Sequence, residues 1–336
     1  MFPISKYLVA AGVAATAALA SSSALACASC GCSLNADWGT QGLGGQAGWS
    51  FDARLDTLNQ NQLRMGTGRI SPAAAAATTN TATNSSAEVE QFTRSTTLTS
   101  TLDYTNGESW GVSVSAPVIK RSHATLGTGS DGTTFDPANG AYVSQISGVG
   151  DVKVLARYFG LTASKNVGLQ FGLKLPTGKT NQVAADGTTA VDPGLQLGTG
   201  TTDLILGAYT FDNLSQNWSY FTQALMQSAL NQSTINNQSY RPGNSVNFNA
   251  GVRYEGFESV RPTLQINTRF VVRDSGLAAD TYATGGTLVY LSPGAVIPIT
   301  DKVAIHTNLQ LPIYQNLNGI QLAPTYIFSA GIHFTF

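Results

Sequence analysis

The three cysteines of the chain lie close together near its start, as Cys27, Cys30 and Cys32 in a C-x2-C-x-C pattern. Three thiolates that converge can hold a soft metal ion such as Cu(I) or Zn(II), and Asp37 could add an oxygen ligand. In an oxidising compartment two of the thiols could instead form a disulfide and leave the third free. Lipidation at Cys27, or no defined role, is the remaining alternative. A soft metal ion at these cysteines is therefore one hypothesis among three, and no other cofactor is expected.

A serine and two histidines near the carboxyl terminus suggest a different chemistry. His306 and His333 are expected to point inward near the ends of adjacent strands, and Ser329 shares a face with His333. Hydrolysis by an activated serine needs a base and a third group that orients the base. The sequence supplies no clear third member. A hydrolase is therefore the lesser alternative, and we predict that the protein is not an enzyme.

Two glycine-rich stretches imitate nucleotide-binding motifs. GTGSDG at 127–132 has GxGxxG spacing but lies in a long predicted loop without a helix behind it, and the stretch at 172–180 is one residue too long for a P-loop. The net charge of -1 also offers no concentrated basic face for phosphates. Neither a nucleotide nor a nucleic acid is a predicted partner.

Strands must position these residues, because much of the chain alternates apolar and polar side chains. The clearest stretches are 110–118, 167–175, 246–254 and 303–313, where every second residue is apolar and Gly, Ser, Thr, Asn, Gln or a charge stands between. This period of two is typical of strands with one face in lipid and the other in a wet lumen. The sequence thus predicts an all-β fold, a transmembrane up-and-down antiparallel β-barrel.

The barrel is predicted to have about twelve strands. They lie near 48–58, 90–104, 110–118, 150–159, 167–175, 202–211, 218–230, 245–254, 260–272, 286–297, 303–314 and 323–336. Short turns alternate with long loops such as 59–89, 119–149 and 176–201. Bacterial barrels have short periplasmic turns and long outer loops, so both chain ends are expected in the periplasm. Aromatic residues such as Trp110 flank the predicted short turns, as rings at the headgroup layer do.

Composition and the first residues agree with an exported barrel. Only 11% of residues are charged, and the mean hydropathy is +0.00. Residues 1–26 resemble a cleaved secretory signal peptide, with one Lys, an apolar run and a small-residue cleavage site. We therefore divide the chain into a signal peptide at 1–26, a Cys-containing periplasmic segment at 27–47 and an outer-membrane barrel at 48–336.

The polar faces of the predicted strands would line the lumen. Nine side chains are assigned to the lumen and to solute contact: Asp52, Arg54, Lys153, Arg157, Lys174, Asp203, Arg253, Arg269 and His306. Since they carry both signs, they form no strong anion or cation ring and suit a small polar or weakly amphipathic solute. Alternatively they pair with one another and fill a narrow barrel. Lys174 and Asp203, on neighbouring strands, could form one such pair.

Four short motifs resemble a known family: GVGDV at 148–152, ARY at 156–158, GLKLPTG at 172–178 and LQLGTG at 195–200. In this order they are similar to the outer-membrane proteins named for the meta-cleavage pathway of phenol degradation, often labelled transporters. The resemblance implies a barrel that passes small compounds, aromatic or hydrophobic ones among them, and it does not include the cysteines.

The sequence therefore predicts an outer-membrane channel or facilitator for small solutes. Its expected partners are outer-membrane lipid, the solute and the barrel-insertion machinery. A structural or adaptor barrel, whose cysteines hold a soft metal or contact a periplasmic redox partner, is the alternative function.

Overall fold

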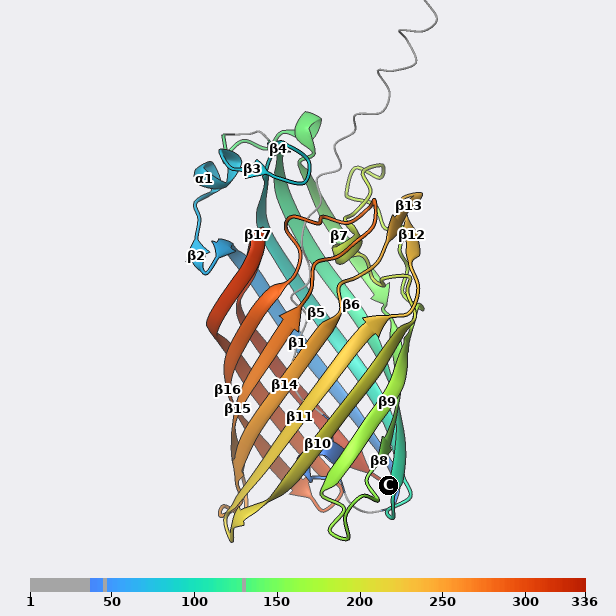
Figure 1. Cartoon of the computed structure of the whole chain (residues 1–336). Coiled ribbons are helices and arrows are strands. Elements are labelled where there is room, and N and C mark those ends of the chain that lie inside the picture. Colours follow the sequence, from blue (N-terminus) through green and yellow to red (C-terminus); the bar gives the residue numbers. More distant parts are fainter. Residues whose placement is uncertain (1–36, 45–46, 129–130) are drawn as a thin grey trace, which may run out of the picture.

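The wall of the molecule is a closed, antiparallel β-barrel (Figure 1). The computed structural model describes residues 37–44, 47–128 and 131–336. Eleven elements form the ring in this described part, each paired with its neighbour in chain order, and the last also pairs with the first. They are β1 (Gly48–Gly66), β5 (Glu88–Thr105), β6 (Trp110–Thr128), β8 (Val152–Tyr158), β9 (Val167–Leu175), β10 (Asp203–Ser215), β11 (Trp218–Ala229), β14 (Ser245–Tyr254), β15 (Arg261–Val271), β16 (Gly286–Thr300) and β17 (Val303–Thr335).

The last element, β17, folds back on itself. Its first half pairs with β16 and its second half with β1, and the amide of Thr335 donates to the carbonyl of Lys302 at 2.9 Å. The reversal occurs near Gly319, whose φ of 60° is left-handed. β17 therefore supplies two stretches of wall. The described ring then has about the number of strands that the sequence predicts, in the predicted order.

The two ends of the barrel differ in their connections. Two or four residues join β5 to β6, β10 to β11, and β16 to β17, all at one end, which we call the short-turn end (Figure 1). The opposite, long-loop end carries β2 (Gly68–Arg69), α1 (Pro72–Ala76), β3 (Thr79–Asn80), β4 (Ser85–Ser86), η2 (Pro137–Asn139), β7 (Tyr142–Val149), η3 (Pro193–Leu195), β12 (Ser233–Ile235) and β13 (Gln238–Tyr240). This asymmetry confirms the predicted alternation of short and long connections. No helix in the described ranges is long and apolar enough to span a bilayer.

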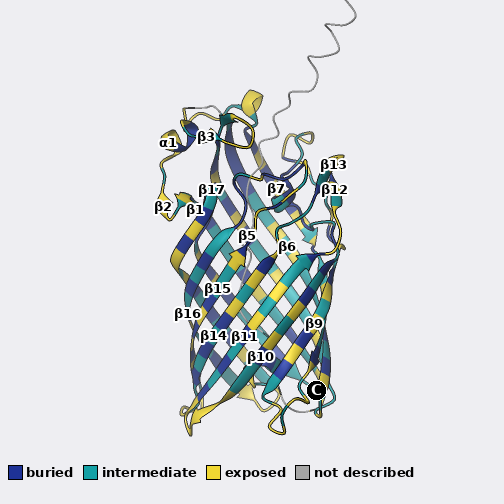
Figure 2. Cartoon of the chain, in the orientation of Figure 1, coloured by how far each residue is buried: buried dark blue, intermediate teal, exposed yellow. Residues whose placement is uncertain are grey.

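Alternation along the strands gives the barrel an apolar outside and a polar inside. On β9, Phe171 is 52% exposed whereas Gln170 is 2% exposed, and Figure 2 shows such alternating bands along the strands of the wall. Both faces of β10 carry apolar residues, with Leu204, Leu206 and Ala208 on one and Ile205 and Tyr209 on the other. Leu206 is exposed and Ile205 is buried, so the set with Leu206 faces outward. The closed barrel and its apolar outer face are those of an outer-membrane protein.

Aromatic rings lie on two stretches of the wall at the short-turn end, where the sequence predicts them. Trp49, Tyr104 and Trp110 form a chain with ring centroids 5.0 and 5.6 Å apart. Trp218 and Tyr254 form another pair, 5.1 Å apart. Amphipathic rings in such a band favour the headgroup layer of a membrane.

Two strands run further toward the long-loop end than the sequence predicts, and a third lies within a predicted loop. β1 continues to Gly66, β6 continues to Thr128, and β7 pairs with this added part of β6, where a loop was expected. Beyond the apolar band, β1, β5 and β6 contribute Leu63, Val89 and Leu126 to a buried hydrophobic cluster. The lipid-facing alternation therefore ends before the strands do, which explains why the predicted strands are shorter than the observed ones.

Candidate functional site

A short segment that precedes the first strand lies inside the barrel near the short-turn end. It comprises residues 37–44, here called the inner segment, and contains the 3-10 helix η1 (Trp38–Gln41). The Asp37 carboxylate caps this helix by accepting from the Gly39 amide at 3.0 Å. Gly42 ends it with a left-handed φ of 73°, and a Cβ there would lie 2.6 Å from the Phe211 ring. The caps at Asp37 and Gly42 thus set the ends of the helix, and the contact with Phe211 of the wall sets its position.

An ion-pair network fastens one side of the inner segment. Arg157 of β8 donates to Asp37 at 2.9 Å and to Asp103 of β5 at 2.7 Å. Gln170 of β9 donates to the second Asp37 oxygen at 3.1 Å. Since Arg157 is 4% exposed, this pairing is largely shielded from solvent. Asp37 therefore contacts two wall strands at once.

Aromatic and backbone contacts fasten the other side. The Trp38 ring stacks on His333 with centroids 4.1 Å apart, and His306 meets the Trp38 ring edge-on at 5.6 Å. His306 Nε2 lies 2.8 Å from an Asp52 oxygen. Arg253 donates to the carbonyl of Gln41 at 3.3 Å. Contacts from opposite parts of the wall thus hold the inner segment across the lumen.

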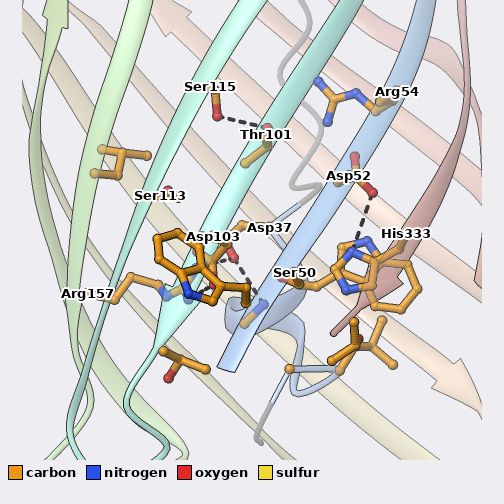
Figure 3. Close-up of a pocket in the computed structure, with 18 of the residues that line it drawn as sticks. Asp37, Ser50, Asp52, Arg54, Thr101, Asp103, Ser113, Ser115, Arg157 and His333 are labelled. Atoms are coloured by element: carbon orange, nitrogen blue, oxygen red, sulfur yellow. Dashed lines mark hydrogen bonds and ion pairs between the residues drawn. The ribbon is translucent and has the colours of Figure 1, made fainter. Parts of the chain in front are cut away.

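A cavity of about 630 Å³ lies beside the inner segment (Figure 3). Asp301, Lys302 and Phe336 line it at the short-turn end, and Asp151 and Lys153 line it further along the barrel. Its wall includes the hydroxyl residues Thr99, Thr101, Ser113 and Ser115 and the apolar residues Pro117, Leu155 and Leu225. The inner segment narrows the lumen and leaves an open space on one side.

The Lys153 side chain reaches this cavity from β8. Arg54, on β1, lines the same space and donates to Asp56 at 2.9 Å. Arg269, on β15, donates to Asn247 at 3.1 Å. Lys153 has no ion-pair partner in the described part of the chain. The residue is exposed and lines the cavity. It is therefore a cation that a passing solute could meet.

Lys174 occupies a denser network between β9, β10 and the residues that join β7 to β8. Its Nζ lies 2.9 Å from Asp151 and 3.3 Å from Asp203, and it donates to the Thr201 carbonyl at 3.0 Å. Lys174 also contacts the Thr199 hydroxyl. The expected Lys174–Asp203 pair is therefore present, with Asp151 as an additional partner.

The nine predicted lumen residues divide into three groups. Asp52, Arg157, Arg253 and His306 surround the inner segment, Lys174 and Asp203 belong to the dense network, and Arg54, Lys153 and Arg269 lie between them along the barrel. Most pair with other protein groups, as the alternative reading of these charges expects. Their contact with a solute stays a prediction.

Sequence reasoning missed the inner segment. Residues 37–44 belong to the predicted periplasmic segment 27–47, and the structure places them inside the barrel. An acid directly before Trp38-Gly39, just ahead of the first strand, is the one local sign of a capped turn. Nothing in the sequence pairs this acid with Arg157, because 120 residues separate them. The partner could be found only from the closed barrel.

The serine and histidines of the hydrolase alternative do not form a nucleophile and base pair. The Ser329 hydroxyl donates to Asp56 at 2.6 Å, and His333 stacks on Trp38. Cys27, Cys30 and Cys32 lie outside the described residues, as does the proposed signal peptide. The soft-metal hypothesis for these cysteines stays a prediction.

No protein-family model and no curated protein matches the chain. An outer-membrane channel from Pseudomonas putida F1 has a TM-score of 0.62 at 12% identity, over 87% of this chain and 96% of that one. The Ralstonia pickettii toluene transporter TbuX reaches 0.43 at 10% identity, over 87% and 90%. The beta domain of the Bordetella autotransporter BrkA reaches 0.44 at 13% identity, over 87% and 100%. The first likeness agrees with the closed-barrel fold, and membership of the phenol-pathway family stays a prediction.

Proposed function

We propose that the protein is an outer-membrane channel for small solutes, and that the inner segment restricts its short-turn end. The observation that supports this most is the cavity of about 630 Å³, which runs beside the inner segment from the short-turn mouth to Lys153. A barrel filled by its own side chains would have no such space. The Pseudomonas putida protein that shares the fold is itself an outer-membrane channel.

The cavity lining favours a small amphipathic solute. Thr101 and Ser115, which hydrogen-bond to each other at 2.9 Å, offer polar atoms to a solute. Leu155 and Leu225 supply apolar surface in the same space, and Lys153 adds a positive charge. A compound with an apolar body and one polar or anionic group matches this combination. Small aromatic acids and alcohols fit this description and agree with the solute class that the sequence resemblance implies.

Conductance in planar bilayers tests the proposal. The wild-type protein should open rarely, since the inner segment crosses the lumen. The Asp37→Asn variant should open more often. Asn still caps a helix, so this change removes the charge that pairs with Arg157 and keeps η1. Asp186→Asn, in an exposed turn of the long 176–202 loop, is the matched control and should behave as wild type.

The solute class is tested in liposomes by uptake of benzenesulfonate and 4-hydroxybenzenesulfonate, aromatic anions that do not cross a bilayer unaided, with a large sugar as the excluded probe. Faster uptake of the aromatic probes through Asp37→Asn than through the wild-type protein is the expected result. Folded protein that stays closed in every variant, with no uptake above empty liposomes, would refute a channel and leave the barrel unaffected.

A further inference from the structure

A second cluster of reactive side chains lies far from the inner segment, at the long-loop end. Glu88 begins β5, His123 lies near the end of β6, and Asp192 precedes η3 in the connection between β9 and β10. One possible ligand atom from each lies within 4.8 Å of the others. Three segments distant in sequence therefore bring two carboxylates and one imidazole together.

The histidine of this cluster has an unsatisfied ring nitrogen. His123 is 0% exposed, and its Nδ1 lies 2.8 Å from the Thr93 hydroxyl. Its Nε2 is buried without a hydrogen-bond partner in the described structure, and so are both carboxylate oxygens of Glu88. Buried polar atoms without partners are uncommon in folded proteins and call for an explanation. A bound cation would satisfy all three atoms.

The surroundings hold one of the ligands in place and add a further carboxyl group. The Tyr142 hydroxyl donates to Asp192 at 2.5 Å. Glu90 lies on the same strand as Glu88 and accepts from the Leu322 amide at 3.0 Å through one oxygen, while its other oxygen is buried without a partner. Hydrogen bonds of this kind from outer groups orient metal ligands.

The neighbouring arginine does not neutralise these acids directly. Arg121 lies two positions before His123, and it donates to the carbonyls of Leu195 and Gln196 at 2.6 and 3.1 Å. It also donates to the Ser95 hydroxyl at 3.0 Å. Neither Glu88 nor Glu90 has a Lys, Arg or His nitrogen within ion-pair distance in the described ranges. No cationic side chain therefore competes with a metal ion for these carboxyl groups.

We propose that Glu88, His123 and Asp192 form a binding site for a divalent transition metal ion, for which Zn²⁺ is the best fit. One imidazole and two carboxylates are ordinary Zn²⁺ ligands, whereas Ca²⁺ and Mg²⁺ prefer oxygen alone. A tetrahedral ion with bonds of about 2.1 Å needs ligand atoms about 3.4 Å apart. The ligand atoms would have to draw together by about an ångström to bind the ion at these distances. The ion would tie β5 and β6 to the 176–202 connection.

Calorimetric titration with ZnCl2 alone tests this site in the full protein. The cysteines are candidate metal ligands too, so the experiment uses a background in which Cys27, Cys30 and Cys32 are all replaced by Ser. One Zn²⁺ per chain should bind in this background, and Glu88→Gln and His123→Ala should each weaken binding at least tenfold. Asp186→Asn, an exposed acid of the same connection, should leave the affinity unchanged. Because the ligands must be deprotonated, binding should weaken as the pH is lowered.

A second measurement keeps the proposal falsifiable if His123→Ala fails to fold. Co²⁺ bound with four ligands gives visible absorption bands, and the isosteric Glu88→Gln variant should change them while circular dichroism stays that of a barrel. Metal binding that disappears with the cysteines, or that persists unchanged in both site variants, would overturn the assignment. Absence of Zn²⁺ binding in the folded Ser background would do the same.

Discussion

Arg157 joins two acids that are far apart in sequence, since its guanidinium lies 2.9 Å from Asp37 of the inner segment and 2.7 Å from Asp103 of β5. The same arginine therefore contributes to the wall and to the obstruction within it. Removing Arg157 leaves two buried or half-buried acids near one another, whereas removing the Asp37 charge leaves the Arg157–Asp103 pair intact. The two changes should therefore affect opening alike and stability differently.

A double-mutant cycle tests this relationship. Arg157→Gln should raise the open probability in planar bilayers as Asp37→Asn does, and the double variant should open no more than the stronger single variant, because the two residues share one interaction. Additive effects would show that the Arg157–Asp37 pair does not hold the inner segment. Folding of each variant is checked by its shift on semi-native gels.

Lys153 should influence the ion selectivity of the open channel. It reaches the cavity without an ion-pair partner among the described residues, so its charge acts directly on ions in the lumen. In the Asp37→Asn background, Lys153→Glu should move the reversal potential in a salt gradient toward cation preference. Lys302→Glu, at the mouth of the same cavity, is the comparison and should have a smaller effect. An unchanged reversal potential in Lys153→Glu would place the ion path elsewhere.

Lys174 should be important for stability. Its side chain is 5% exposed and pairs with Asp151 and Asp203. Breaking a buried pair from one side commonly costs about 3–5 kcal/mol, because the remaining charge keeps its desolvation cost. Lys174→Met should lower the free energy of unfolding in urea by about this amount. Asp203→Asn should cost less, since Lys174 keeps Asp151, and equal losses would contradict this view of the network.

The 272–285 connection should be less stable at neutral than at acid pH. Burial raises the pKa of Asp274, which accepts from the Tyr240 hydroxyl at 2.9 Å and the Gly243 amide at 2.7 Å. The folded loop then holds the Asp274 proton more tightly than the unfolded chain, whose Asp pKa is about 3.9. Its stability is therefore full below that value and falls as the pH rises through the raised pKa.

The stability of the 272–285 connection is measured at pH 4 and pH 7 by hydrogen exchange of the Gly243 amide, corrected for the intrinsic exchange rate. Protection should decrease from pH 4 to pH 7 in the wild type, and it should decrease less in Asp274→Asn. Some decrease should remain in that variant, because burial also raises the pKa of neighbouring Asp280. Asp186→Asn is the control, because hydrogen bonds from Thr189 and the Thr188 amide lower the pKa of Asp186 to about 2, outside this interval. Protection that rises with pH would contradict the sign.

The sequence by itself determined the class of fold, the order of the strands and the outward face of most of them. The period-2 alternation on β6, β9, β14 and β17 carries this information because a strand in a membrane wall must show lipid an apolar side chain at every second position. Turn length distinguished the two ends, and aromatic residues marked the short-turn end, where amphipathic rings favour the headgroup layer. These signals are local, so they can be recognised without knowing what lies across the lumen.

Only the tertiary structure decided what fills the barrel and which charges meet. Asp37 reaches Arg157 across 120 positions, and Trp38 stacks on a histidine three residues from the end of the chain. Glu88, His123 and Asp192 converge from two strands and one connection. Such contacts depend on closure of the sheet between β1 and β17, which sets the distance between every pair of facing side chains. No local sequence pattern contains the distance between facing side chains. The period-2 alternation therefore predicts which residues point into the barrel, and it does not show which residues they contact there.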